Sequence, residues 1–220
     1  MKRAEARHLV GVLLLAAMPL ACTAQISEKT LNAQLLDYAR QGDAERVILL
    51  VDKGANPNSR NRVGKTPLHM FAAAGNSSAV EFLVENGADV NLAALDKTTP
   101  LMAACFAAKP EIVEYLLAHG ADASARDQLE KTAMVYAAGE GCAECVRSLL
   151  DHGVEVNARG RHELTPLMWA AGQGHAGTAE LLISRGADPS LRDDRGKTAA
   201  DIATDAAHPE LAELLRPARP

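Results

Sequence analysis

Two cysteines separated by two residues are the sharpest chemical feature of this 220-residue sequence. The segment Cys142-Ala143-Glu144-Cys145 has a spacing that allows a disulfide in an oxidising compartment, and a helix N-terminus would stabilise a thiolate there. Three interpretations stay open: a core residue (Cys145) beside a surface residue (Cys142), a disulfide, and a reactive dithiol. The dithiol is the least favoured, because the sequence predicts no βαβ unit of the thioredoxin type around it.

Two histidines raise the question of a metal site. His119 and His152 stand 33 residues apart, one at the end of each of two similar segments. Zinc requires ligand atoms about 2 Å from the ion, and no compact third and fourth ligand follows from the sequence. We therefore expect exposed histidines at helix ends and no metal.

Other catalytic patterns are also missing from the sequence. It has no Ser-His-Asp ordering, no Gly-rich phosphate loop and no carboxylate pair whose spacing implies acid–base chemistry. The sequence therefore predicts a protein that is not an enzyme and has no cofactor.

Composition limits both the fold and the partner. Hydrophobic residues make up 48% of the chain, enough for a core, but only 3% of residues are aromatic. The core must therefore consist of small side chains at close helix contacts, which favours stacked helices over a sandwich or barrel. A formal charge of -5 at pH 7 disfavours nonspecific binding to nucleic acid.

A repeat of 33 residues organises the chain. The motif Gly-Ala-Asp, or a close variant, begins at Gly54, Gly87, Gly120, Gly153 and Gly186. A second series keeps the same register and begins at Thr66, Thr99, Thr132, Thr165 and Thr198. The two series together define a structural unit with a fixed internal order.

Each unit predicts a pair of short helices followed by an extended loop. Thr66 can cap the first helix, and Pro67 fits its first position because a missing N–H costs nothing there. Gly75 ends this helix, and Gly87 suits the left-handed conformation after the second. The polar residues 89–98 then form a finger that leads to the next unit. Because such short helices are unstable alone, they must stack on their neighbours.

This unit resembles the ankyrin repeat, through Thr66-Pro67-Leu68-His69 and Gly87-Ala88-Asp89-Val90-Asn91 at 33-residue spacing. The resemblance implies an all-α solenoid of stacked helix-turn-helix pairs with extended finger loops, in which His69 ties loops together by hydrogen bonds. The implied organisation is a lead-in at 25–32, an N-terminal cap at 33–65, repeats at 66–98, 99–131, 132–164 and 165–197, a C-terminal cap at 198–216 and a tail at 217–220.

The first 24 residues have the layout of a secretory signal peptide. A basic start precedes the apolar run 9–18, and small residues follow at 21–24. The run is about half the roughly 20 residues that cross a bilayer, so we do not expect a membrane span. Cleavage after Ala24 would release a chain into the periplasm of a bacterium, which we favour. The alternative is a lipoprotein anchored through Cys22.

The resemblance implies that a partner protein binds to the finger tips and the exposed end of the first helix of each repeat, on the concave face. The residues at these positions are Arg60, Arg62, Arg126, Arg159, Arg161, Arg192 and Arg195 on the fingers, and Phe106, Tyr136 and Trp169 on the helices. Aromatic residues beside arginine are typical of binding hot spots, so we predict a monomer that binds an acidic segment of another protein. The competing interpretation is that the arginines are merely solvated and the aromatic rings pack between repeats.

Two functions follow from these features. The first is a binding module in the bacterial envelope, which either supports an envelope enzyme or inhibits a toxin as an immunity protein. The second is a redox-active envelope protein that uses Cys142 and Cys145. Reactive thiols would favour the second function, and buried, unreactive thiols would exclude it.

Overall fold

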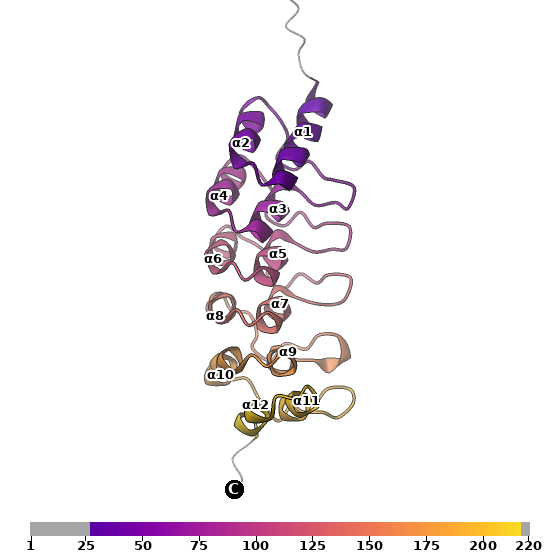
Figure 1. The fold of residues 1–220 in the computed structure, drawn as a ribbon, viewed down its shortest axis with the longest axis vertical. Coiled ribbons are helices and arrows are strands. Elements are labelled where there is room, and N and C mark those ends of the chain that lie inside the picture. Colours follow the sequence, from indigo (N-terminus) through magenta and orange to yellow (C-terminus); the bar gives the residue numbers. More distant parts are fainter. Residues whose placement is uncertain (1–26, 217–220) are drawn as a thin grey trace, which may run out of the picture.

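The computed structural model describes residues 27–216; the predicted signal segment 1–24, Cys22 within it and the 217–220 tail lie outside this range. The described chain is a stack of six helix pairs without a strand (Figure 1). One helix of each pair belongs to an inner row: α1 (Glu28–Gln41), α3 (Pro67–Ala74), α5 (Pro100–Phe106), α7 (Ala133–Gly139), α9 (Pro166–Gln173) and α11 (Ala199–Asp205). The other belongs to an outer row: α2 (Ala44–Asp52), α4 (Ser77–Glu85), α6 (Pro110–Ala118), α8 (Ala143–Asp151), α10 (Ala176–Ser184) and α12 (Pro209–Leu214).

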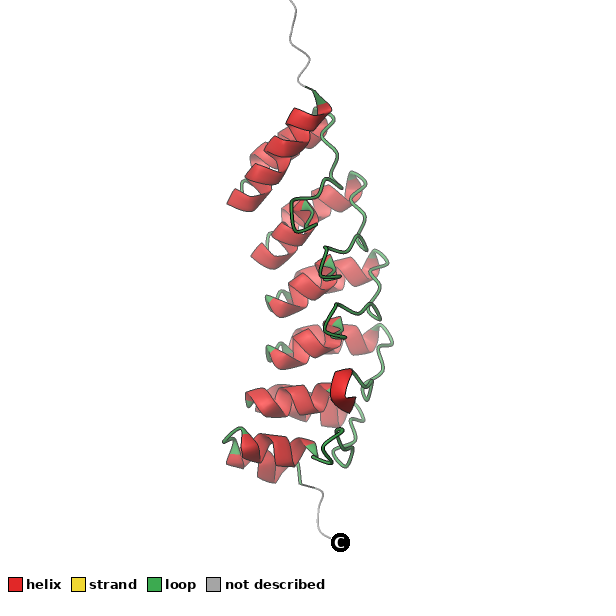
Figure 2. Ribbon diagram, turned by 90° about the vertical axis from the view of Figure 1, so that its right-hand side faces the viewer, coloured by secondary structure: helices red, strands yellow, loops and turns green. Residues whose placement is uncertain are grey.

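Five loops, which we call the first to fifth fingers, join each outer helix to the next inner helix. They comprise residues 53–66, 86–99, 119–132, 152–165 and 185–198, and the fourth contains a short 3-10 turn, η1 (Arg161–Glu163). The fingers project to one side of the stack and follow one edge of it (Figures 1 and 2). We call the exposed side of the inner helices, together with the adjoining side of the fingers, the inner face.

The inner helices begin and end as their residue types predict. Thr66, Thr99, Thr132, Thr165 and Thr198 all cap an inner helix through their side chains. The Thr99 hydroxyl, for example, accepts a hydrogen bond from the Met102 amide at 3.2 Å. Gly75 ends α3 at φ +80° and Gly87 follows α4 at φ +87°, where a side chain would be strained.

The core consists of columns in which one repeat position is buried in successive units. On the inner helices the column is Leu35, Leu68, Leu101, Met134 and Leu167, each at most 1% exposed. On the outer helices it is Val47, Val80, Val113, Val146, Ala179 and Ala212. Each column continues from one unit to the next, so the thin core predicted from composition runs the length of the stack.

An asparagine ladder joins neighbouring fingers. The side-chain amide of Asn91 donates through its nitrogen to the Gly120 backbone carbonyl at 3.0 Å. Its oxygen accepts from the Asp122 backbone N–H at 2.8 Å. Asn58 and Asn157 make the same pair of bonds to the units that follow them. Ser124 takes this position in the third finger and bonds instead to Asp122 of its own finger at 2.6 Å. The joint between the third and fourth fingers therefore lacks the ladder.

A buried histidine fastens the first finger to the second. The Nδ1 atom of His69 accepts from the Thr66 amide at 3.2 Å, which leaves the proton on Nε2, and Nε2 donates to the Thr98 carbonyl at 3.1 Å. His69 is 1% exposed, and this burial lowers its pKa.

The N-terminal unit differs from the predicted boundaries. Helix α1 begins at Glu28, so residues 28–32 of the expected lead-in 25–32 are helical. Ser27 caps this helix by accepting from the Thr30 amide at 3.3 Å, and the Asn32 side chain accepts from the Asn56 amide at 2.8 Å. These contacts occur only in the N-terminal unit, outside the repeat frame, which is why the repeat did not reveal them.

The ladder predicts that Ser124→Asn stabilises the chain. In the unit after Ser124, the Gly153 carbonyl and the Glu155 amide stand at the repeat positions of Gly120 and Asp122. An asparagine side chain at position 124 can therefore bond to both, as Asn91 does in its own joint. We expect the free energy of unfolding to rise by about 0.5–1.5 kcal/mol in urea titrations. The reciprocal variant, Asn91→Ser, should lower it by a similar amount. Equal stability of all three chains would contradict the ladder's role.

The buried histidine predicts an acid-sensitive stability. Because the pKa of His69 is lowered from its ordinary 6.5, the unfolded chain binds the proton more readily than the folded chain. The stability that the neutral, buried His69 contributes is fully present above pH about 6.5 and is lost as the pH falls below that value. In melting experiments over this range, His69→Gln should show a flatter pH dependence than the parent. An unchanged slope would show that other groups govern the acid response.

Candidate functional site

Three aromatic side chains form a chain of contacts on the inner face, one from each of three consecutive inner helices, with a lysine between the second and the third. Phe106 of α5 is 58% exposed, and its ring meets the ring of Tyr136 on α7 edge to face, with centroids 5.8 Å apart. The ammonium group of Lys131 lies 5.4 Å from the centroid of Tyr136 and 4.5 Å from that of Trp169 on α9. We call Phe106, Lys131, Tyr136 and Trp169 the aromatic cluster. The structure thus brings together all three of the predicted aromatic residues.

The position of Tyr136 is fixed by a buried carboxylate. Its hydroxyl donates to Asp127 at 2.5 Å, and the other oxygen of Asp127 accepts from the amides of Leu129 and Lys131 at 2.7 and 2.9 Å. Burial, together with the bond to Asp127, raises the pKa of Tyr136. The third finger and α7 therefore hold this ring in one place, and a preorganised ring loses little freedom when a ligand covers it.

Lys131 is a cation held against aromatic surface. It takes part in none of the ion pairs found among residues 27–216. Cation–π contacts with two rings stabilise its position without neutralising its charge. The cluster therefore offers an anion a charge directly beside apolar surface.

Several of the predicted finger arginines brace the fingers. Arg126 donates to the Glu130 carbonyl at 3.1 Å and to the Arg159 carbonyl of the next finger at 3.2 Å. Arg60 donates to the carbonyls of Gly64 and Ala93 in the same manner. Since these acceptors are neutral carbonyls, both arginines keep their net charge. The sequence signal for this brace was the recurrence of arginine at one repeat position.

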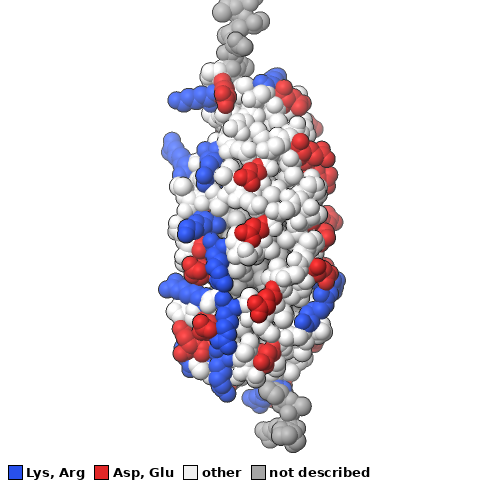
Figure 3. Space-filling model, turned by 180° about the vertical axis from the view of Figure 1, so that it is seen from behind, with Lys and Arg blue, Asp and Glu red and all other residues white. Residues whose placement is uncertain are grey.

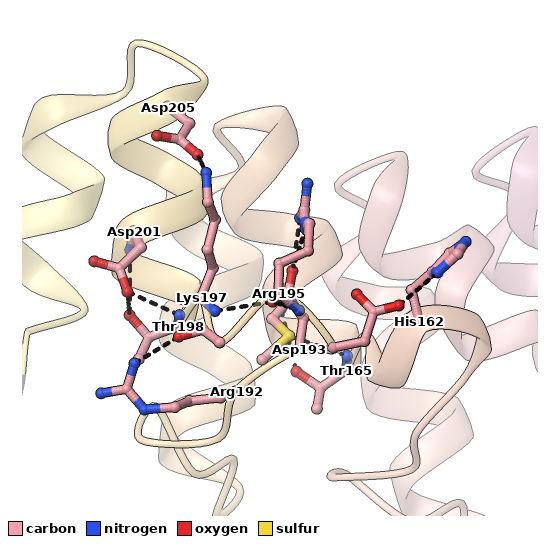
Figure 4. Close-up of polar contacts among 12 residues, drawn as sticks. His162, Thr165, Arg192, Asp193, Arg195, Lys197, Thr198, Asp201 and Asp205 are labelled. Carbon is pink, nitrogen blue, oxygen red and sulfur yellow. Dashed lines mark hydrogen bonds and ion pairs between the residues drawn. The ribbon is translucent and has the colours of Figure 1, made fainter.

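Other predicted arginines face carboxylates. Arg159 pairs with Glu163 at 2.7 Å, in addition to a bond with the Arg192 carbonyl at 3.4 Å. In the fifth finger, Arg195 binds the buried carboxylate of Asp193 at 2.6 and 2.9 Å (Figure 4). Pairing of this kind leaves less positive charge for a ligand than a bond to a carbonyl does.

Three predicted arginines remain. Arg192 donates to the Gly196 carbonyl of its own finger at 2.6 Å. Arg62 and Arg161 are exposed on finger tips, and within residues 27–216 their side chains make no hydrogen bond or ion pair. Of the seven predicted arginines, these last two are therefore the most accessible to a partner.

Charge is distributed unequally between the two sides of the stack. The outer helices carry eleven Asp and Glu against two basic residues, whereas the fingers carry thirteen Lys and Arg against ten Asp and Glu. Figure 3 shows Lys and Arg gathered along the finger side, with mainly Asp and Glu on the outer side. The finger side therefore carries a more positive charge than the side of the outer helices.

The cysteine pair is buried. Cys142 and Cys145 form a disulfide with an S–S distance of 2.08 Å at the start of α8, and they are 7% and 0% exposed. The interpretation of Cys142 as a surface residue is therefore wrong, because its side chain turns inward to meet Cys145. Cys105 is a buried free cysteine, and burial raises the pKa of its thiol. Neither arrangement presents an accessible thiolate.

The paired histidines cap helices. His119 and His152 each donate from Nδ1 to the carbonyl four residues earlier, at 2.8 and 2.9 Å. Within residues 27–216, no group of three or more His, Cys, Asp or Glu side chains is arranged to hold a metal ion. In the same range, none of the helices is long and apolar enough to cross a membrane.

Comparison with protein families accounts for this architecture. A family model described as "Ankyrin repeats (3 copies)" matches residues 35–127, 122–193 and 159–219. This chain belongs to the ankyrin-repeat family. The stack of helix pairs with fingers is accordingly an ankyrin solenoid, and ankyrin repeats mediate protein–protein interactions. No curated protein matches the chain as a relative.

The bond between Tyr136 and Asp127 predicts a stabilising role for the tyrosine hydroxyl in this ankyrin solenoid. Tyr136→Phe keeps the ring but leaves one oxygen of a buried carboxylate without its donor, so we expect a loss of about 1–3 kcal/mol in the free energy of unfolding. Urea titration measures this loss. Tyr38→Phe serves as the control, because the Tyr38 hydroxyl makes no hydrogen bond to residues 27–216. If both variants had the same free energy of unfolding, the hydrogen bond from Tyr136 to Asp127 would not stabilise the fold.

Proposed function

We propose that this ankyrin solenoid is exported into the bacterial envelope and binds a partner protein there through its inner face. In this proposal the chain acts as a monomer in the periplasm and carries out no catalysis. Binding either supports an envelope enzyme or inhibits a toxin, as an immunity protein does. A lipid anchor at Cys22 is the alternative to a free periplasmic chain.

The aromatic cluster is the observation that carries this proposal. The repeat position of Tyr136 and Trp169 holds Met70, Ala103 and Ile202 in other units, so the solenoid does not require an aromatic ring there. Phe106 likewise occupies the position of Ala73 and Gly139. Phe106 is exposed, and the half-buried rings of Tyr136 and Trp169 hold the Lys131 cation. Such a group of rings beside a cation, in a protein with few aromatic residues, is typical of a binding hot spot.

Charge supports an acidic segment as the ligand. Lys131 has no carboxylate partner in residues 27–216, and Arg62 and Arg126 keep their charge on the same side of the molecule. Carboxylates of a partner would gain from these cations both during the approach and in the complex. The outer helices, with their excess of Asp and Glu, would repel the same segment.

Two features support export. The first is the signal-peptide layout of residues 1–24, and the second is the disulfide of Cys142 and Cys145, since disulfides persist in oxidising compartments. Burial of both sulfur atoms argues against exchange with an external thiol, so we do not propose the redox function.

The test replaces the cluster with residues that other repeats already use. Phe106→Ala, Lys131→Thr and Trp169→Met reproduce Ala73, Thr98 and Met70 at the same repeat positions, so the solenoid should remain folded. We expect the parent to capture a specific partner from envelope extract and the triple variant to bind that partner at least about tenfold more weakly. Arg126 and Arg159 stay unchanged because they brace the fingers.

The matched control is Arg147→Glu, which changes an exposed charge on the outer helix α8. It should capture the partner as the parent does, and circular dichroism should show native helix content in all chains. Capture of the same proteins by the parent and the triple variant would exclude the aromatic cluster as the binding site.

A further inference from the structure

A groove separate from the aromatic cluster lies at the N-terminal end of the inner face, between α1 and the first finger. Its cavity volume is about 750 Å³. Leu36, Val63 and Met70 supply its apolar lining, and Val63 is 55% exposed. Arg40, Arg60 and Arg62 supply cationic groups around the apolar residues. The groove thus combines uncovered apolar surface with positive charge.

The groove follows from the way the N-terminal unit is built. Ala33, Leu36, Asp37 and Arg40 lie at helical spacing on one face of α1 and line the cavity together. Within residues 27–216, α1 is the only inner helix that no finger precedes. It has 14 residues where α3 has 8, and its first turns run beside the first finger. One stripe of α1 therefore faces the finger across an open space.

The charge of the groove is positive. The first finger, residues 53–66, contains Lys53, Arg60, Arg62 and Lys65 and no Asp or Glu. Asp37 is the one acidic residue of the lining, and it is paired with Arg40 at 2.6 Å. Arg60 donates to neutral carbonyls, and Arg62 makes no ion pair within residues 27–216. Both guanidinium groups therefore keep their positive charge, and Arg62 is the more accessible of the two for a carboxylate.

We propose that this groove binds an acidic, amphipathic segment of the partner protein. A large apolar side chain of the segment covers Leu36, Val63 and Met70, and Asp or Glu residues beside it pair with Arg60 and Arg62. The inference rests on the proposed function, because it assumes a protein partner, but it concerns a second contact site. The chain's own segment 1–24 does not suit the groove, because Lys2, Arg3 and Arg7 have the same charge as its arginines.

Met70 provides a local probe of the groove. It is half-buried in the lining, whereas Met102, Met134 and Met168 are at most 2% exposed in the core. In the purified chain labelled with 13C at the methionine methyl groups, each methyl gives its own NMR signal. The probe ligand is an acetylated peptide in which Phe and Leu are flanked by glutamates. One comparison peptide has lysines in place of the glutamates, and the other has serines in place of Phe and Leu.

We expect the glutamate peptide to shift the Met70 signal saturably and to leave the three core signals unchanged. Both comparison peptides should bind at least about tenfold more weakly. Arg62→Glu should weaken binding of the glutamate peptide by about fivefold or more, while Arg147→Glu leaves it unchanged. No Met70 shift, an equal shift with the lysine peptide, or unchanged binding by Arg62→Glu would each overturn the proposal. Unperturbed core signals verify that the variants are folded.

The two proposals can fail separately. If the triple variant of the aromatic cluster loses the envelope partner while Arg62→Glu retains it with parental affinity, the groove proposal is overturned and the proposed function stands. If Arg62→Glu loses the partner and the triple variant retains it, the groove is the principal contact and the aromatic cluster is not.

Discussion

Stacking of each helix pair on its neighbours is the constraint on which the rest of the structure depends. Helices of 6 to 14 residues do not persist alone in water, and each pair has apolar surface on two sides. Burial of one leucine position and one valine or alanine position in successive units removes that surface from water. The fingers, their arginine braces and the asparagine ladder are all held in register by this stacking. The inner face can vary in residue type because the columns behind it stay apolar and buried.

The sequence predicted the backbone of this molecule well, because the determinants recur. Thr66 and its equivalents cap helices through contacts that span three residues, and Gly75 and Gly87 adopt conformations that their residue type favours. The start of α1 was missed because the contacts of Ser27 and Asn32 occur only once. A feature that appears in a single unit leaves no periodic signal.

The candidate binding surface was harder to predict, since it depends on contacts between units. The prediction named Phe106, Tyr136 and Trp169, but Lys131 was missed, although its ammonium group joins two of the rings. Arginine was expected at the finger tips as a binding residue, yet Arg126 reaches a backbone carbonyl in the next finger. Arginine recurs at the bracing position, but its backbone acceptors have no signature in residue type. The structure was therefore needed to separate bracing arginines from accessible ones such as Arg62.

The serine in the asparagine ladder affects the mechanics of the whole solenoid. In a stack of repeats each unit contacts only its neighbours, so the stack deforms most easily at the joint with the fewest shared bonds. Ser124 places that joint between the third and fourth fingers, where Arg126 still braces but no ladder pair forms. The contact of Lys131 with Trp169 crosses the same joint. A ligand that held Lys131 and Trp169 together would restrain the stack at this joint, and it would thereby couple the curvature of the solenoid to occupancy of the inner face.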